Sequence, residues 1–260
     1  MTSLDQTELL IGFEKPARPA RPVARGSLAE ELAAFDGFGK TTRVLTTAST
    51  SFTGAASAVP TYVNEFWTAK QRQAQSLHEV SYRACFKPQL PRFFIERLTQ
   101  PGDVVYDPFM GRGTTPLEAA LLGRVPFGCD INPLSILLTR PRLSPPALGQ
   151  VAARLKEIDF TDAEEAPEDL LVFYHAETLR EICALKKYLR EREAAGARDA
   201  VDDWIRLVAL NRLTGHSKGF FSVYTLPPNQ ATSVASQRKI NAKRNQTPDR
   251  RQVPDIILKK

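Results

Sequence analysis

Two glycines and a pair of carboxylates carry the clearest chemical signal in this sequence. The run Val104-Val105-Tyr106-Asp107 has the composition of a short buried strand, and it leads into a loop that contains Gly111 and Gly113. Glycines let the backbone approach a ligand closely and adopt φ values that a Cβ atom disfavours. A second predicted strand, residues 125–129, ends in Asp130, where a carboxylate can accept hydrogen bonds from both hydroxyls of a ribose. The pattern predicts the binding of a nucleoside-containing cofactor.

The residues between the two strands must form a helix that holds these groups in place. Thr114 or Thr115 can cap a helix over residues 116–122, and the free N–H groups of its first turn would face the ligand. Strand, glycine loop, helix, strand and acid, in this order, indicate a nucleotide-type α/β fold. We predict an α/β protein with a doubly wound, mainly parallel, Rossmann-like sheet and helical additions on the C-terminal side.

The carboxylate of Asp107 argues against a dinucleotide as the ligand. It would repel a pyrophosphate at close range, whereas it suits a ligand with a positive end, such as the ammonium group of a methionine moiety. The third glycine of a dinucleotide fingerprint is also missing, since Gly113 is followed by Thr114, Thr115 and Pro116. A nicotinamide-dependent dehydrogenase is therefore the lowest-ranked alternative.

The longer string around the glycine loop is more specific. Asp107-Pro108-Phe109-x-Gly111-x-Gly113-Thr114-Thr115 is followed by Glu118-Ala119 and by Gly128-x-Asp130-Ile131-Asn132-Pro133. From about Ala84 to Pro133 the sequence resembles the S-adenosylmethionine motif of the DNA amino-methyltransferases, which make N6-methyladenine or N4-methylcytosine. The alternative is an ordinary βαβ unit with a tight turn, which the joint occurrence of these motifs disfavours.

This resemblance implies S-adenosylmethionine as the cofactor and indicates the residues that bind it. The family pairs the loop with an upstream segment, matched here by residues 82–91, and the analogy places Lys87-Pro88 beside the methionine end. The residues expected to bind the cofactor are Lys87, Pro88, Asp107, Pro108, Phe109, Gly111, Gly113, Thr114, Thr115, Asp130, Ile131 and Asn132.

A second motif of this family has no match. Such enzymes hold a flipped base with Asp, Asn or Ser, then Pro-Pro, then an aromatic residue: the polar groups accept the amine hydrogens and the ring stacks on the base. Ser144-Pro145-Pro146-Ala147 lacks the ring, and Leu226-Pro227-Pro228-Asn229 lacks both the acceptor and a good stacking residue. The catalytic residues stay unassigned. We expect a chain that stops before its catalytic motif, through truncation or a split gene, or one that a second chain completes.

Charge indicates a polyanionic partner, which the resemblance implies is duplex DNA. The net charge is +6, and the last thirty residues hold eight basic and two acidic side chains. A solvated surface and a plain helix-terminating loop at Thr214–Gly219 are the alternatives. The residues predicted to contact nucleic acid are His216, Lys218, Arg238, Lys239, Lys243 and Arg244.

Three regions organise the chain. We predict a poorly ordered N-terminal arm over residues 1–60, in which Ser27 and Glu30 have capping-box spacing for a short helix and residues 41–60 form a loop with at most one strand. The cofactor-binding α/β core covers residues 61–140. Residues 141–260 form a helical insertion, one further strand over 220–224 and a basic tail, with target recognition as the candidate role. Helices are predicted over 93–98, 134–138, 148–158, 177–195 and 200–213.

Several classes of protein are disfavoured. The sequence has no apolar run of about 18 residues and no signal-peptide core, so we expect a cytoplasmic protein without a membrane partner. The cysteines Cys85, Cys129 and Cys183 lack CxxC spacing, and His78, His175 and His216 have no metal-ligand spacing, so neither a disulfide nor a metal site is expected.

Two rivals to an autonomous DNA methyltransferase rank above the dehydrogenase. The first is a non-catalytic module that binds cofactor and DNA, with the missing motif lost or supplied by another chain. The second is a methyltransferase that acts on RNA or on a small molecule.

Overall fold

The computed structural model of the chain describes residues 27–50, 56–68, 75–82, 85–225 and 232–259. It divides into two compact units that the chain enters more than once. The first comprises Met1–His78, Phe86–Met110 and Thr114–Cys129, and the second comprises Glu79–Cys85, Gly111–Gly113 and Asp130–Lys260. Among the described residues no helix is long and apolar enough to cross a bilayer.

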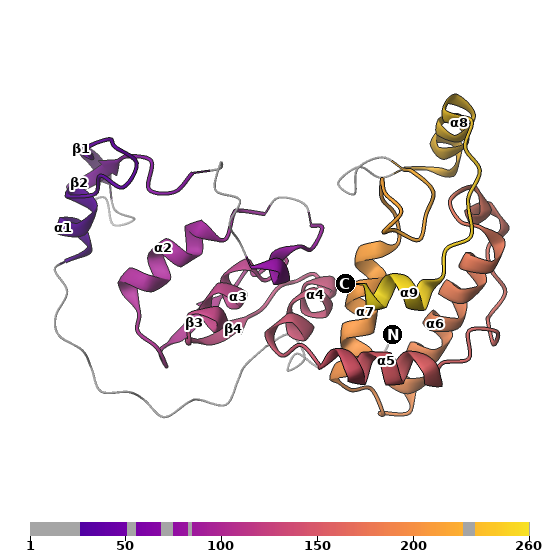
Figure 1. The fold of residues 1–260 in the computed structure, drawn as a ribbon. Helices are drawn as coiled ribbons and strands as arrows, with labels where there is room; N and C mark the ends of the chain where they lie inside the picture. Colours follow the sequence, from indigo (N-terminus) through magenta and orange to yellow (C-terminus); the bar gives the residue numbers. More distant parts are fainter. Residues whose placement is uncertain (1–26, 51–55, 69–74, 83–84, 226–231, 260) are drawn as a thin grey trace. The chain divides into compact units, whose positions relative to one another are not determined.

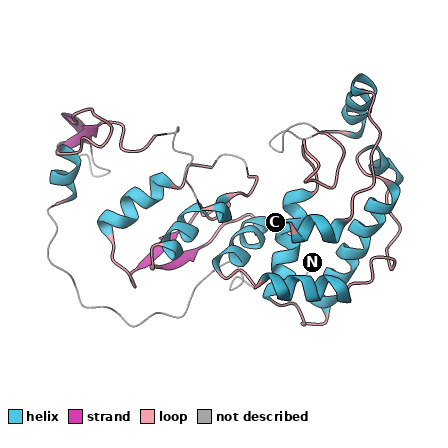
Figure 2. Cartoon of the chain, in the orientation of Figure 1, coloured by secondary structure: helices cyan, strands magenta, loops and turns pink. Residues whose placement is uncertain are grey.

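The first unit is a mixed α/β structure (Figures 1 and 2). A short 3₁₀ turn, Ser76–His78, precedes its second helix. Its elements in chain order are α1 (Leu28–Ala33), β1 (Arg43–Thr50), β2 (Ala56–Val63), α2 (Gln89–Leu98), β3 (Val104–Asp107), α3 (Thr114–Leu121) and β4 (Val125–Gly128).

The predicted βαβ unit is confirmed. β3 and β4 pair in parallel, from Val104 opposite Val125 to Asp107 opposite Gly128, and α3 connects them. Among the described residues these two strands make up the whole parallel sheet. The α/β class is therefore observed, whereas the described chain holds only one βαβ step of the predicted doubly wound sheet.

The region between α1 and the core differs from the prediction. Instead of a loop with at most one strand, β1 and β2 form an antiparallel hairpin. Contacts across the two strands explain the pairing: the hydroxyls of Thr47 and Thr61, which are diagonal neighbours, lie 2.6 Å apart, and β-branched residues suit such strands. The capping box of α1 is present as predicted, because Glu30 N donates to Ser27 Oγ and Ser27 N donates to a Glu30 carboxylate oxygen.

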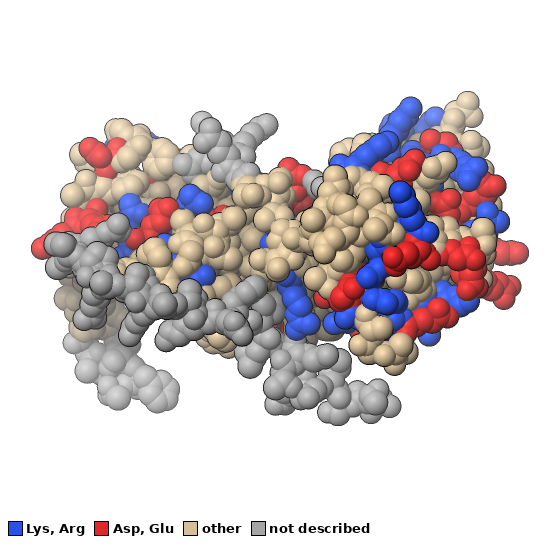
Figure 3. Space-filling view, turned by 60° about the horizontal axis from the view of Figure 1, so that its bottom comes forward, with Lys and Arg blue, Asp and Glu red and all other residues tan. Residues whose placement is uncertain are grey.

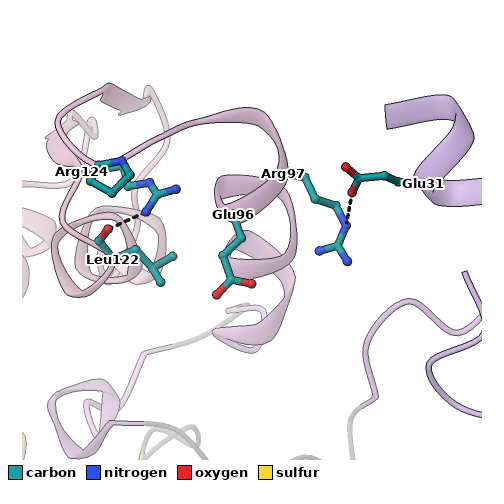
Figure 4. Close-up of a pocket in the computed structure, with 6 residues that line it drawn as sticks. Glu31, Glu96, Arg97, Leu122 and Arg124 are labelled. Carbon is teal, nitrogen blue, oxygen red and sulfur yellow. Dashed lines mark hydrogen bonds and ion pairs between the residues drawn. The ribbon is translucent and has the colours of Figure 1, made fainter. Parts of the chain in front are cut away.

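An aromatic cluster ties the N-terminal segment to α2. The rings of Phe35, Phe66 and Trp67 each lie within about 6 Å of the ring of Phe93. An ion pair of 3.4 Å between Glu31 and Arg97 joins α1 to α2 beside a cavity of about 460 Å³ (Figure 4). These contacts give α1 a fixed place on the first unit.

The second unit is helical around one apolar core. Its elements are α4 (Pro133–Leu143), α5 (Leu148–Glu157), a 3₁₀ turn (Glu168–Val172), α6 (Ala176–Ala194), α7 (Ala200–Arg212), α8 (Val234–Arg244) and α9 (Val253–Leu258). The predicted helices over 148–158, 177–195 and 200–213 are confirmed within one or two residues. The helix after Pro133 runs five residues further than predicted, and the helix predicted over 93–98 begins earlier, as α2.

One prediction for the C-terminal part was wrong. Residues 220–224 form no strand, only a single bridge between Gly215 and Tyr224, and their apolar character reflects burial of Phe221 in the helical core. The basic tail contains two helices, α8 and α9, that the sequence analysis did not predict. Val253 and Ile257 of α9 are almost fully buried in the same core.

This burial predicts that the C-terminal helix stabilises the second unit. Ile257→Ala should lower the free energy of unfolding by about 2–5 kcal/mol, since it removes a buried side chain and leaves a cavity. Leu148→Ala is the matched control, because Leu148 is largely exposed and should change stability by less than about 0.5 kcal/mol. Denaturant unfolding of both variants measures the difference. Equal stability of the two would contradict the placement of α9.

Candidate cofactor site and nucleic-acid surface

In the first unit, the loop that follows β3 is fixed at its start. Phe109 N donates to Asp107 Oδ1 over 3.0 Å, which closes a turn around the carboxylate. Cys129 N donates to Asp107 O and Met110 N donates to Cys129 O, each over 3.1 Å, so the loop stays attached to the end of β4. The carboxylate of Asp107 is therefore held at the carboxyl end of a parallel strand, where open α/β sheets bind ligands.

In the second unit, Asp130 holds both the glycine loop and the start of α4. Its Oδ2 accepts from Gly111 N and its Oδ1 accepts from Asn132 N, both over 2.8 Å. Asn132 in turn caps α4, because its Oδ1 accepts from Leu134 N over 3.1 Å. Each carboxylate oxygen keeps a further lone pair. The predicted bond from Asp130 to a ribose thus stays a prediction, and it is compatible with this second, structural role.

The close approach of the loop to α4 requires glycine at position 113. Gly113 has a φ of +79°, and an ideal Cβ there would lie 2.2 Å from Thr139 Oγ1. Gly111 also has a positive φ, of +51°, with Tyr82 Cε1 at 3.5 Å from its ideal Cβ position. The two positions predicted from the sequence therefore require glycine for different reasons. At position 113 the missing Cβ atom allows α4 to pack close to the loop, and at position 111 glycine mainly allows the positive φ of the turn.

Two residues that support the loop are absent from the sequence prediction. Arg142 is buried; its Nε donates to Leu138 O over 2.6 Å, and its guanidinium also donates to Arg112 O in the middle of the loop. Burial, with the nearby charge of Arg112, lowers the pKa of Arg142 to about 10. Tyr82 OH accepts from Asn132 Nδ2 over 3.2 Å. No sequence spacing marks these contacts, because they depend on how α4 folds back.

The segment that carries Tyr82 is itself pinned to α7. Asn211 on α7 accepts from Ser81 N over 3.0 Å and donates to Glu79 O over 2.9 Å. Val80 packs in a small apolar cluster with Leu138 and Leu207. Helices of the second unit thus hold residues 79–82 beside the glycine loop.

A buried acid joins three segments of the first unit. Glu118 on α3 accepts from Arg92 Nε over 2.8 Å and lies 2.7 Å from His78 Nε2. Both the Glu118 and His78 side chains are almost fully buried. Desolvation would raise the pKa of Glu118, but the hydrogen bonds and charges of His78 and Arg92 outweigh it and hold that pKa below its ordinary value. Glu118, named in the sequence only as part of a motif, therefore connects α3, α2 and the 3₁₀ turn.

The remaining predicted cofactor residues occupy defined places within the units. Pro88 is the N-cap residue of α2 and accepts from Arg92 N over 3.1 Å, with Lys87 exposed just before it. Thr114 and Thr115 begin α3. Phe109 and Ile131 are strongly exposed apolar residues, at 86% and 98%.

The structure brings some of the predicted residues together directly. Asp130, Asn132 and the loop glycines form one connected group in the second unit. Asp107, Pro108, Phe109, Thr114, Thr115, Lys87 and Pro88 belong to the first unit, and the two groups are joined through the chain at 110–111, 113–114 and 129–130.

The predicted nucleic-acid residues lie mostly on one helix, α8. Arg238, Lys239, Lys243 and Arg244 are all exposed and take part in none of the ion pairs among the described residues. Figure 3 shows Lys and Arg side chains gathered at the upper right of the view, at the end of the second unit that carries α8. The guanidinium of Arg244 also lies over the ring of Tyr224, 3.7 Å from its centroid.

An amide network fixes the face of α8 that meets the rest of its unit. Gln237 and Gln246 both donate to Tyr224 O, over 2.9 and 3.0 Å, and both donate to Asn241 Oδ1 over 2.7 Å. Asn241 then donates to Val172 O over 2.8 Å. Because these amides pair with the rest of the unit, the cationic side chains of the helix stay in solvent.

His216 and Lys218 lie exposed on a turn whose base is tied down. Gly215 N donates to Ser222 Oγ over 3.1 Å, and Arg251 donates to the carbonyls of Ser217 and Phe220. The His216 ring packs 5.9 Å from the ring of Phe220. These hydrogen bonds hold the turn in one shape, and the Lys218 side chain takes part in none of them.

Comparison with known proteins finds a family whose sequence model matches part of this chain. Residues 41–138 match the sequence model of the family described as DNA methylase. Over these residues the chain is similar to that family.

Curated relatives also match part of the chain. The chain is 33% identical over 76 residues to the type II methyltransferase M.MjaII of Methanocaldococcus jannaschii, a match that covers 29% of this chain and 14% of the relative. It is 31% identical over 97 residues to M.MvaI of Kocuria varians, covering 36% and 20%. It is 31% identical over 123 residues to M.BsoBI of Geobacillus stearothermophilus, covering 39% and 24%. The chain thus spans less than a third of these relatives, and no solved structure matches it significantly.

Substitutions of Asp130 test its predicted bond to a ribose beside its observed bond to the glycine loop. Asp130→Ala should weaken S-adenosylmethionine binding and also release Gly111 N, whereas Asp130→Asn keeps one acceptor oxygen. A charge-assisted hydrogen bond contributes about 1.5–3 kcal/mol, so calorimetry should show a loss of at least tenfold in affinity for Asp130→Ala and a smaller loss for Asp130→Asn. Unchanged affinity in both variants would contradict the placement of the ribose.

The buried acid predicts a pH dependence of stability. Because the folded-state pKa of Glu118 is depressed, its ionisation stabilises the fold above the ordinary glutamate pKa, and this contribution is lost as pH falls through the folded value. Glu118→Gln should therefore cost more stability at pH 7 than at pH 4, measured by denaturant unfolding. Glu168→Gln, at an exposed carboxylate, is the control and should show a small effect at both values. A Glu118→Gln penalty that does not change with pH would contradict the assignment.

Proposed function

We propose that this chain binds S-adenosylmethionine and duplex DNA and forms part of a DNA methyltransferase that acts on the exocyclic amine of adenine or cytosine. The observation that carries the proposal is the glycine loop held by Asp130. Both glycines have positive φ, the acid accepts a loop N–H, and an acid at this place suits ribose hydroxyls.

The residues present fit such a cofactor on chemical grounds. Asp107 at the end of β3 offers a carboxylate for an ammonium group, and its Oδ2 accepts no hydrogen bond from the described residues. The side chains of Phe109 in the first unit and of Ile131 in the second are exposed, and each offers apolar surface for a base. S-adenosylmethionine supplies an activated methyl group, so the protein has to orient the acceptor amine and exclude water rather than activate the donor.

The chain's two Pro-Pro pairs do not supply the base-holding motif. Ser144 is the C-cap residue of α4, so Ser144-Pro145-Pro146-Ala147 connects two helices and does not follow a strand. Leu226-Pro227-Pro228-Asn229 lies outside the described residues. We infer that the amine-holding residues come from another polypeptide segment, and that β3, α3 and β4 are one step of a doubly wound sheet that such a segment extends.

A binding module without catalytic activity is the second candidate function. The lack of an acceptor-Pro-Pro-aromatic motif favours it, and the exposed cations of α8 serve either function equally. Transfer of a labelled methyl group to duplex DNA by the chain together with a polypeptide segment that carries the acceptor-Pro-Pro-aromatic motif separates the two, because a binding module should show no turnover even when that segment is present.

The cofactor part of the proposal is tested by ligand-dependent stability. S-adenosylmethionine or its demethylated product at about a hundred times its dissociation constant should stabilise the protein by about 2.7 kcal/mol, whereas NAD should have no effect. Gly111→Val, which places a β-branched side chain at a positive φ, should abolish the shift. A flat response of the folded protein to both sulfur ligands would refute this part of the proposal.

The DNA part is tested through α8. Replacing Arg238, Lys239, Lys243 and Arg244 by Ala should weaken duplex binding and reduce the slope of log affinity against log salt by about 0.9 for each phosphate that the protein no longer neutralises. The control carries Lys187→Ala and Arg190→Ala, which remove two cations on α6 that already pair with Asp162 and Glu164. Equal salt slopes for the two proteins, measured by fluorescence anisotropy, would exclude α8 as the phosphate-binding surface.

A further inference from the structure

One cation of α8 is held differently from the others. The guanidinium carbon of Arg244 lies directly over the Tyr224 ring, 3.7 Å from its centroid. Arg244 follows Gln237 by about two turns of helix, so both side chains leave α8 on the face that meets the rest of the unit. Lys239 and Lys243 leave the helix on the other side. Arg244 is therefore a planar group supported by an aromatic ring, whereas these lysines are point charges on exposed, flexible chains.

The ring beneath Arg244 has a fixed position. Tyr224 O accepts from Gln237 Nε2 over 2.9 Å and from Gln246 Nε2 over 3.0 Å. Its two chain neighbours, Val223 and Thr225, are buried, and the N–H of each donates to a backbone carbonyl of the same unit. The protein therefore sets the plane of the ring, and with it the plane of the stacked guanidinium, before any ligand binds.

The end of α8 fixes the point from which Arg244 projects. Asn245 has a φ of +47°, a conformation that asparagine accepts at the end of a helix. Its N–H donates to Ala242 O over 3.2 Å, and Gln246 N donates to Asn241 O over 3.0 Å. Arg244 is thus the last residue of a helix whose end is closed by hydrogen bonds.

The edge of the Arg244 guanidinium is available for a ligand. Arg244 is exposed, and among the described residues it donates no hydrogen bond and pairs with no carboxylate. A guanidinium holds its N–H donors in one plane as a rigid fork, which matches two acceptors that lie side by side. The stacked arginine therefore offers a preorganised fork without an acceptor.

A guanine base fits this fork better than a phosphate does. In the major groove of DNA, guanine presents its O6 and N7 acceptors side by side, and a bidentate arginine is the commonest specific contact to them. A phosphate contact needs positive charge more than a fixed plane, and the exposed cations Arg238, Lys239 and Lys243 already offer that charge. A plane fixed in advance favours acceptors that share one plane, as those on the edge of a base do.

We propose that Arg244, supported by Tyr224, reads the O6 and N7 atoms of a guanine in the major groove and so gives the protein a preference for that base. This proposal rests on the proposed function and extends it from phosphate binding to base recognition. Arg244 is the residue that contacts the base, and Tyr224 is a positioning residue that keeps the guanidinium in its plane.

The test selects duplexes from a library with random central base pairs by binding to the full chain, and then sequences them. The parent should prefer guanine at one position by at least about fivefold. Arg244→Lys keeps the charge but removes the fork, so it should lose this preference and keep the salt dependence of binding. Arg250→Lys is the matched control, because Arg250 is an exposed arginine of the same unit that pairs with Glu177, and it should select the same sequences as the parent.

A modified base tests the contact at the level of single atoms. 7-Deazaguanine at the selected position replaces the N7 acceptor by a C–H group. It should weaken binding of the parent at least about fivefold and leave binding of Arg244→Lys unchanged. Tyr224→Phe keeps the ring and should keep the preference, whereas Tyr224→Leu should reduce it without changing the salt slope. Denaturant unfolding checks that both variants are folded.

The outcomes separate this proposal from the function on which it rests. Duplex binding by the parent without any preference for guanine would overturn base reading and leave the proposed DNA binding intact. A guanine preference that persists in Arg244→Lys, or a loss of affinity that is the same for all sequences, would also overturn it, the latter in favour of a phosphate contact. Failure of the parent to bind any duplex would refute the proposed DNA binding itself.

Discussion

The arrangement of the second unit around the glycine loop depends on one close approach. α4 can pack against residues 111–113 only because position 113 has no Cβ atom, since any side chain there would meet Thr139. Arg142 and Asp130 secure the same approach from two sides, the first through a loop carbonyl and the second through a loop N–H. The loop therefore keeps its shape through contacts of its backbone groups.

The first unit shows the opposite situation, an element with too few partners. Parallel sheets are normally covered on both faces and extend over several strands, because each strand exposes apolar residues in two directions. Here β3 has one partner among the described strands, and its exposed valine and tyrosine lie beside an apolar groove. Among the described residues the outer edge of β3 therefore stays unpaired.

The surface proposed to bind DNA has a different physical basis. The polar face of α8 that meets the rest of its unit consists of neutral amides, which bond to carbonyls and to one another. Neutral amides leave the long cationic side chains unpaired by local carboxylates, in contrast to α6, whose lysine and arginine pair with Asp162 and Glu164. This difference separates a surface suited to phosphates from an ordinary salt-bridged surface.

Local sequence patterns determined the parts of the protein that depend on neighbours in the chain. The β3–α3–β4 step, the two loop glycines, the capping box at Ser27 and the helices α5, α6 and α7 follow from hydrophobic periodicity and turn chemistry within short windows. The family relationship also followed from a continuous motif. The cofactor and DNA roles of individual residues stay predictions.

Only the tertiary structure decided which apolar segments become core and which polar groups meet. Phe221 has the local pattern of a strand, but burial among helices determines its conformation. Arg142, Tyr82 and the partners of Glu118 act across 26 to 50 residues of sequence, so no spacing rule indicates them. The physical reason is that burial energy depends on the complete set of contacts, and that set is fixed only when distant segments pack together.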